Sequence, residues 1–92
     1  MARTPEEDIA KAVVEYLKTV PGKIDNIRNI IAALPDFIQL TPEDEQESET
    51  RPGEALWEQS VRNIVSHKNS PGNAIHDGWL AHERPAKLYI PD

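Results

Sequence analysis

Three stretches of the chain place apolar residues at helical spacing, and they predict three helices. Residues repeat at intervals of three and four positions from 9 to 20, from 24 to 34 and from 57 to 65, which puts each set on one helix face. The third helix is expected to run from about Glu54 to His67. The repeating positions are Ile9, Val13, Tyr16, Leu17 and Val20, then Ile24, Ile27, Ile30, Ile31 and Leu34, then Trp57, Val61, Ile64 and Val65.

Capping and helix-breaking residues set the expected ends of the first two helices. Thr4 and Glu7, three residues apart, fit a capping box in which the threonine hydroxyl accepts a hydrogen bond from the glutamate amide. Pro21-Gly22 is expected to end that helix. Asp25 is the expected cap of the second helix, and Pro35 closes it.

The C-terminal part predicts a β-hairpin. Residues 78–82 form the first strand, residues 83–86 the turn and residues 87–90 the returning strand, with Leu80, Leu88 and Ile90 pointing inward. Residues 23–25 are expected to pair briefly with this hairpin. The chain is therefore predicted to be a single α+β domain over residues 1–92, a three-helix winged helix-turn-helix with a C-terminal β-hairpin wing.

One segment interrupts this pattern. Residues 43–51 contain no apolar side chain and are mostly acidic. We expect them to form a solvated, mobile connector before the third helix.

Composition restricts the chemistry of the chain. There is no cysteine, which excludes disulfides, thiolate metal sites and a cysteine nucleophile. The N-terminus lacks the apolar run of a signal peptide, and no stretch is long and apolar enough to span a bilayer. We expect a cytoplasmic protein with no membrane partner.

The charge is unevenly distributed, although the net value is −6. Between residues 36 and 58, eight acidic residues accompany the single base Arg51. Between residues 60 and 90 the bases Arg62, Lys68, Arg84 and Lys87 outnumber Asp77 and Glu83. DNA binding requires a basic face rather than a basic total, so the second half is where such a face is expected.

The outward face of the third helix carries the candidate DNA contacts. Gln59, Arg62, Asn63 and Ser66 lie opposite its apolar stripe, and such side chains bond base edges and phosphates. His67 and Lys68 follow at the helix end, where the histidine would touch phosphate or cap the helix. Arg84 and Lys87 flank the hairpin turn and would contact the DNA backbone.

Catalytic and metal chemistry are not expected. His67, His76 and His82 have no spacing typical of a zinc site. Serine, histidine and aspartate are present, but without a nucleophile elbow or a glycine-rich oxyanion loop. We therefore expect no enzyme activity, no cofactor and no metal.

The segment RPGEALWEQSVRN, residues 51–63, together with Ser66-His67 and the later residues 78–80 and 88–90, resembles the winged-helix domains of the Mrr N-terminal type found in restriction endonucleases. The resemblance implies DNA recognition, in some members of modified bases, with cleavage by a separate domain. It also implies that Gln59, Arg62, Asn63 and Ser66 contact DNA from the recognition helix, and Arg84 and Lys87 from the wing. The chain departs from the family in its acidic connector and in having no nuclease domain.

Two functions remain open at this point. The first is a recognition or modified-base-sensing module of a restriction-type system, with double-stranded DNA, including methylated DNA, as its partner. A nuclease domain or subunit and a second copy of the chain are further expected partners. The alternative is a winged helix for protein–protein interaction or dimerisation, which the acidic charge and an apolar patch around Trp79 and Tyr89 would suit.

Overall fold

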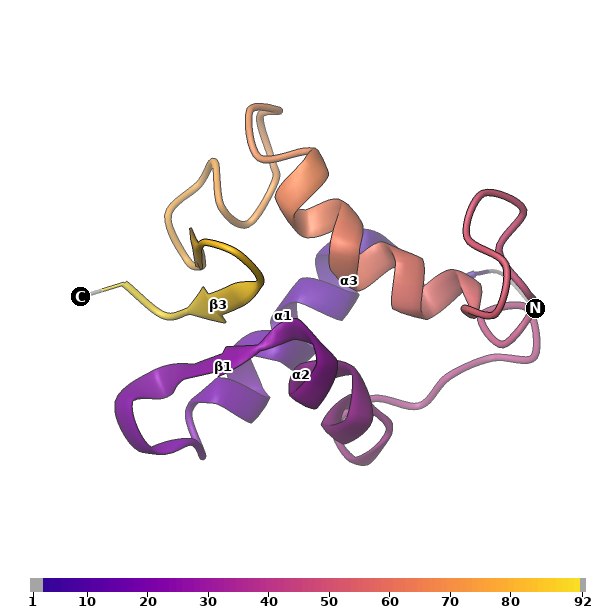
Figure 1. Ribbon diagram of the computed structural model, residues 1–92, viewed down its shortest axis with the longest axis horizontal. Coiled ribbons are helices and arrows are strands. Elements are labelled where there is room, and N and C mark those ends of the chain that lie inside the picture. The colour runs from indigo at the N-terminus through magenta and orange to yellow at the C-terminus, as the bar shows by residue number, and fades with distance from the viewer. Residues whose placement is uncertain (1–2, 92) are drawn as a thin grey trace.

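Over the described residues, 3–91, the computed structural model contains three α-helices and a three-stranded antiparallel sheet (Figure 1). The helices are α1 (Glu6–Leu17), α2 (Ile27–Ala33) and α3 (Leu56–Ser66). The strands are β1 (Ile24–Asn26), β2 (Ala81–Glu83) and β3 (Lys87–Tyr89). Short 3-10 turns occupy Pro21–Lys23 and Leu34–Asp36. The α+β class and the predicted order of elements are confirmed, and the arrangement is compatible with a winged helix.

Strand β3 is the centre of the sheet, which has the order β1-β3-β2. Leu88 lies opposite Asp25 of β1 and His82 of β2, so the predicted hairpin and the short early strand pair as expected. The first hairpin strand begins at Ala81 instead of Gly78. Gly78 has a φ of 90°, and the amides of residues 79 and 80 bond the carbonyl of Ala74, which keeps these residues in a turn.

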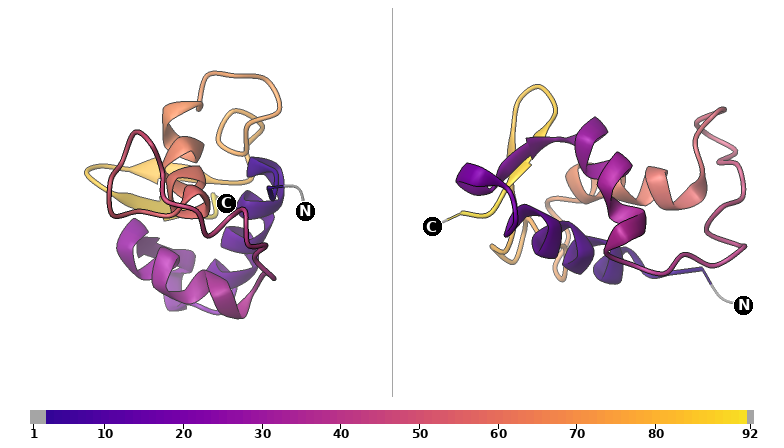
Figure 2. Two further views of the ribbon diagram at one scale, coloured as in Figure 1. Left: turned by 90° about the vertical axis from the view of Figure 1, so that its right-hand side faces the viewer. Right: turned by 90° about the horizontal axis from the view of Figure 1, so that it is seen from below.

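The core is formed by the three predicted apolar stripes and the hairpin. Its removal from water is the main favourable term in folding. Helix α1 packs on one side of α3, whereas α2 and the hairpin lie on the other side (Figure 2). Val20, Ile31, Val65 and Ile90 are only partly buried. The largest fully buried apolar side chains are Ile9, Val13, Leu17, Ile30, Leu34, Val61, Ile64, Leu80 and Leu88.

The predicted capping box at the start of α1 is wrong. Pro5 occupies the N-cap position, and no side chain caps the helix there. Thr4 lies outside the helix and bonds Asp44, with its amide 2.7 Å from Oδ1 and its hydroxyl 2.6 Å from Oδ2. Asp44 accepts from both the amide and the hydroxyl of Thr4, whereas in a capping box only the amide would donate to a carboxylate.

The predicted cap of α2 is shifted by one residue. Asn26 caps the helix by accepting from the amide of Asn29 at 2.8 Å. Asp25 belongs to β1, where it is paired with Leu88. Its carboxylate instead accepts from the hydroxyl of Tyr16 at 2.6 Å and from the side-chain amide of Asn29 at 2.9 Å.

The acidic segment 43–51 is not solvated throughout, which corrects the expectation of a solvated connector. Asp44 has no exposed surface and Ser48 is 3% exposed. Glu47 forms a β-bridge with Ala55, and the amide of Ser48 donates to the carbonyl of Glu54 at 2.7 Å. Polar groups are buried at low cost when they are hydrogen-bonded, so the lack of apolar residues did not exclude burial here.

Candidate nucleic-acid interface

The orientation of α3 agrees with the predicted one. Trp57, Val61 and Ile64 are buried, and none is more than 6% exposed. On the opposite side Ser66 is exposed, while Gln59, Arg62 and Asn63 are partly buried. All four lie away from the buried stripe, but Gln59, Arg62 and Asn63 are covered in part by neighbouring segments, and Asn63 faces α1.

Gln59 is held by the loop that precedes α3. Its side-chain oxygen accepts from the hydroxyl of Ser48 at 2.6 Å, and its nitrogen donates to the hydroxyl of Thr50 at 2.8 Å. Both ends of the amide are thereby engaged. Gln59 therefore fixes the loop to the helix, and its predicted contact with a base edge, which would require these bonds to break, stays a prediction.

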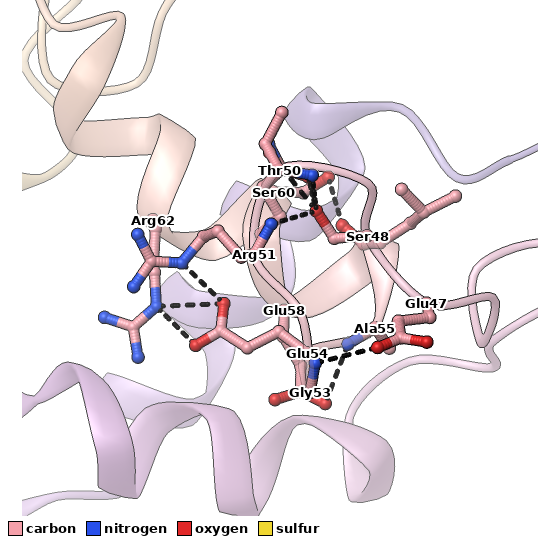
Figure 3. A network of polar contacts seen from close by, with 12 residues as sticks. Glu47, Ser48, Thr50, Arg51, Gly53, Glu54, Ala55, Glu58, Ser60 and Arg62 are labelled. Atoms are coloured by element: carbon pink, nitrogen blue, oxygen red, sulfur yellow. Dashed lines mark hydrogen bonds and ion pairs between the residues drawn. The ribbon is translucent and has the colours of Figure 1, made fainter.

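Arg62 forms an ion pair with Glu54 (Figure 3). Its Nε lies 2.8 Å and 3.1 Å from the two carboxylate oxygens, and its side chain is 35% exposed. Arg51 donates from its own Nε to the same carboxylate at 2.9 Å. Within residues 3–91, neither arginine uses its terminal NH₂ groups in a hydrogen bond. These groups are the ones that bind phosphate or guanine bidentately.

Asn63 and His67 lie on a different side of α3 from Arg62. They line a hollow with residues at the start of α1, and His67 Nδ1 lies 3.0 Å from the carboxylate of Glu6. His67 is also the C-cap residue of α3, which agrees with one of its two expected roles, and its contact with phosphate stays a prediction. Lys68 is exposed in the turn that follows the helix.

The hairpin, α2 and α3 meet at a groove that we call the α2–α3 groove. It is lined by Asn26, Ile27, Arg28, Arg62 and Ala86. The amide of Ile27 donates to the carbonyl of Ala86 at 2.8 Å, which fixes the hairpin turn to the start of α2. Arg84 and Lys87, predicted as hairpin contacts, flank Ala86 and are exposed.

Arg28 belongs to this groove, although the sequence did not single it out. It is exposed on α2, next to the buried Ile27. Two features of the sequence could have pointed to Arg28. It lies in the first turn of the helix that precedes the predicted recognition helix, and it is outside the apolar stripe of that helix. The groove thus brings together a base from α2 and a base from α3 beside the two bases of the hairpin.

The electrostatics around Asp25 place Lys87 near β1. Burial alone would raise the pKa of the Asp25 carboxyl, but hydrogen bonds from Tyr16, Asn29 and the amide of Asn26, with the positive charge of Lys87, hold it below its ordinary value. The contact between Tyr16 and Asp25 also raises the pKa of the Tyr16 hydroxyl, chiefly because that hydroxyl donates to the carboxylate. Lys87 thus has an acidic neighbour, whereas no ion pair involves Arg28 or Arg84 among residues 3–91.

The remaining ionisable groups form no larger cluster. In the part of the chain that is described, no three histidine, aspartate or glutamate side chains are close enough together to hold a metal ion. His76 Nδ1 lies 2.9 Å from Asp77, and this contact lowers the pKa of the aspartate. None of the helices described is both long and apolar enough to cross a membrane.

Comparisons with protein-family models, curated proteins and solved structures found no match to this chain.

Proposed function

We propose that the chain is a winged helix that binds double-stranded DNA through one face, with α3 as the recognition helix and the β2–β3 hairpin as the wing. The element order and the β1-β3-β2 sheet support this, because they are compatible with the winged-helix arrangement. The hairpin turn and the loop before α3 project to the same side, away from α1 (Figure 2).

The α2–α3 groove is the single observation that carries the proposal. Arg28 and Arg62 line it from two helices, and Arg84 and Lys87 flank the hairpin residue that closes it. Four bases in or near one groove can follow a phosphate backbone even in a chain of net charge −6. Asn63 and His67 face α1, so in this proposal they contribute little to the interface.

We further propose that the domain is the recognition or modified-base-sensing module of a restriction-type system, acting in the cytoplasm. The likeness of residues 51–63 to the Mrr N-terminal domains supports this part. In such a system cleavage would be supplied by a separate nuclease domain or subunit, and this chain would need neither catalytic residues nor a cofactor.

The test is a titration of fluorescently labelled duplexes, methylated and unmethylated, at several salt concentrations. Four phosphate contacts predict that log K falls with log salt with a slope of about −3.6, at about −0.9 for each contact. The Arg84→Ala/Lys87→Ala variant should lower the affinity and reduce the slope by about 1.8. Lys11→Ala is the matched control, because Lys11 lies on the outer face of α1 beside Phe37.

The DNA-binding proposal fails if the hairpin variant binds as tightly as the parent or if Lys11→Ala weakens binding equally. A preference for methylated over unmethylated duplex would support the sensing role. Equal affinity for the two duplexes would remove that role and leave general DNA binding.

A protein–protein interaction winged helix is the second candidate. It is favoured by Phe37, which is 38% exposed and lines a hollow on α1 with Ala12 and Ile38. Trp79 and Tyr89, the residues first expected to form an apolar patch, are each partly buried. Light scattering of the parent and of Phe37→Ser discriminates: excess mass that the substitution removes supports dimerisation, and a monomer for both chains argues against it.

A further inference from the structure

Glu54 joins two arginines that come from different segments. Arg51 lies in the loop before α3, whereas Arg62 is on the helix itself. Each donates from Nε to the Glu54 carboxylate, at 2.9 Å for Arg51 and at 2.8 and 3.1 Å for Arg62 (Figure 3). We call this group of three side chains the Glu54 bridge.

The Glu54 bridge keeps a positive charge and leaves the binding ends of both arginines available. Two guanidinium groups and one carboxylate sum to one positive charge. Because Nε is the atom that contacts Glu54, the terminal NH₂ groups remain open for a second anion. The Glu54 side chain is only 18% exposed, whereas the side chains of Arg51 and Arg62 are 48% and 35% exposed. The two arginine side chains are therefore more accessible to solvent, and to a ligand, than the Glu54 carboxylate.

The loop that carries Arg51 is anchored at several points. The hydroxyl of Ser48 accepts from the amide of Arg51 at 3.1 Å and donates to Gln59 of α3 at 2.6 Å. The amide of Glu54 donates to the carbonyl of Arg51 at 3.0 Å, and Glu47 accepts from the amide of Gly53 at 3.0 Å. The position of Arg51 relative to α3 is thus set by the fold, and less ordering is needed on binding.

The Glu54 bridge continues the basic face of the domain. Arg62 belongs both to the bridge and to the α2–α3 groove. The loop before α3 and the hairpin project to the same side of α3 (Figure 2). Arg51 lies in this loop and shares the Glu54 carboxylate with Arg62, so it adds a base next to Arg62. Guanidinium groups match the oxygens of a phosphodiester in charge and in planar geometry.

We infer that Arg51 and Arg62 together bind one backbone phosphate of DNA, and that Glu54 is a positioning residue which orients both guanidinium groups. This inference rests on the proposed DNA-binding function. It adds Arg51 to the interface. It also gives the loop before α3 a role, since the Glu54 carboxylate in that loop orients the two arginines instead of repelling the DNA.

The direction in which Glu54→Gln changes the affinity for DNA tests this inference. If Glu54 acted only through its charge, Glu54→Gln would tighten DNA binding, because it removes a negative charge beside the DNA. A positioning role predicts weaker binding despite that gain. Glu49→Gln is the matched control, since Glu49 is an exposed acid of the same loop with no hydrogen bond or ion pair among the described residues. It should tighten binding by about twofold.

Arg51 gives a second and independent measurement. Arg51→Ala should weaken binding about tenfold, the loss of one charge-assisted contact. The salt slope should fall by less than about 0.9, because Arg62 still contacts the shared phosphate. Arg51→Lys keeps the charge but loses the planar fork, so it should also weaken binding. Thermal unfolding of each variant shows whether the fold is retained.

The outcomes separate the two proposals. If the parent chain binds no duplex, the DNA-binding function and this inference both fail. If the parent binds while Glu54→Gln tightens binding like Glu49→Gln, the positioning role of Glu54 is overturned alone. If Arg51→Ala leaves the affinity unchanged, Arg51 makes no phosphate contact, and the inference is wrong although the DNA-binding function stands.

Discussion

Replacing Asp44 by alanine should destabilise the fold more than any other change to the acidic segment. Its carboxylate has no exposed surface and accepts from the amide and hydroxyl of Thr4 and from the amide of Thr41, at 2.6 to 2.8 Å. Its backbone carbonyl accepts from Trp57 at 3.1 Å. Asp44 thereby joins Thr4 before α1, Thr41 in its own turn and Trp57 at the start of α3.

The size of the effect follows from the donors left behind. The Thr4 hydroxyl can rotate toward water, but two backbone amides lose their acceptor, and each unsatisfied donor costs about 1–3 kcal/mol. We expect a loss of about 3 kcal/mol. A domain of this length has a free energy of unfolding of roughly 5–14 kcal/mol, so the loss is a large fraction of the total. Urea unfolding followed by circular dichroism should show a midpoint lower by about 2 M.

The pH dependence checks the same contact. Burial would raise the pKa of Asp44, but the hydrogen bonds from Thr4 and Thr41 outweigh burial and hold the pKa below its ordinary value. A lowered pKa in the folded state stabilises the fold above the unfolded pKa, about 3.9, and that stability is lost as the pH falls through the folded pKa. The difference in unfolding free energy between the parent and Asp44→Asn should therefore narrow below about pH 4.

Glu43→Ala is the control for this prediction, because Glu43 is the exposed neighbour of Asp44 in the same turn. It should change the free energy of unfolding by less than about 0.5 kcal/mol. If Asp44→Ala unfolds at the same urea concentration as Glu43→Ala, the buried carboxylate does not stabilise the fold.

Two further predictions concern polar contacts between distant segments. Gln59→Ala should lower the free energy of unfolding by about 1–2 kcal/mol, because the Ser48 and Thr50 hydroxyls lose their partner on α3. It should also speed amide hydrogen exchange in residues 47–52. Unchanged exchange would show that the loop is held without Gln59. Tyr16→Phe should cost about 1–2 kcal/mol at neutral pH by removing the bond to Asp25, and an NMR titration should show the pKa of Asp25 rising toward its ordinary value. An unmoved pKa would contradict the assigned contact.

The apolar pattern predicted the elements well because burial follows helical and strand periodicity. Val13 and Leu17 on α1, and Val61 and Ile64 on α3, are buried as their spacing requires. Leu88 is likewise buried at the centre of the sheet. Each of these positions depends on the local repeat of one element, which is present in the sequence itself.

Polar partners were not predictable in the same way. Thr4 and Asp44 are 40 positions apart, and Ser48 and Gln59 are 11 apart. A side-chain hydrogen bond between two segments leaves no periodic pattern, so a buried aspartate looks like a solvated one in the sequence. This is why segment 43–51 was expected to be a solvated connector.

The candidate interface was predicted in its helix and hairpin but not in its details. The outward position of Arg62 followed from the helical repeat, whereas its ion pair with Glu54 depends on how the preceding loop folds back. In the sequence Arg28 is an exposed base on a short helix like any other. Only the groove, which depends on how α2 packs on α3, shows that it lies near Arg62. His67 was expected to touch phosphate or to cap the helix, and it is the C-cap residue of α3. Its contact with Glu6 comes from the packing of α1 on α3, which the sequence does not show.

The central claim is that the face formed by the α2–α3 groove and the hairpin binds DNA. Its most direct test is NMR chemical-shift mapping of the chain, including the arginine Nε–Hε signals, during titration with a short duplex. We expect the largest changes on Arg28, Arg62 and the hairpin turn at residues 84–87. Changes confined to the outer face of α1 around Lys11 and Phe37, with the groove signals unmoved, would contradict it.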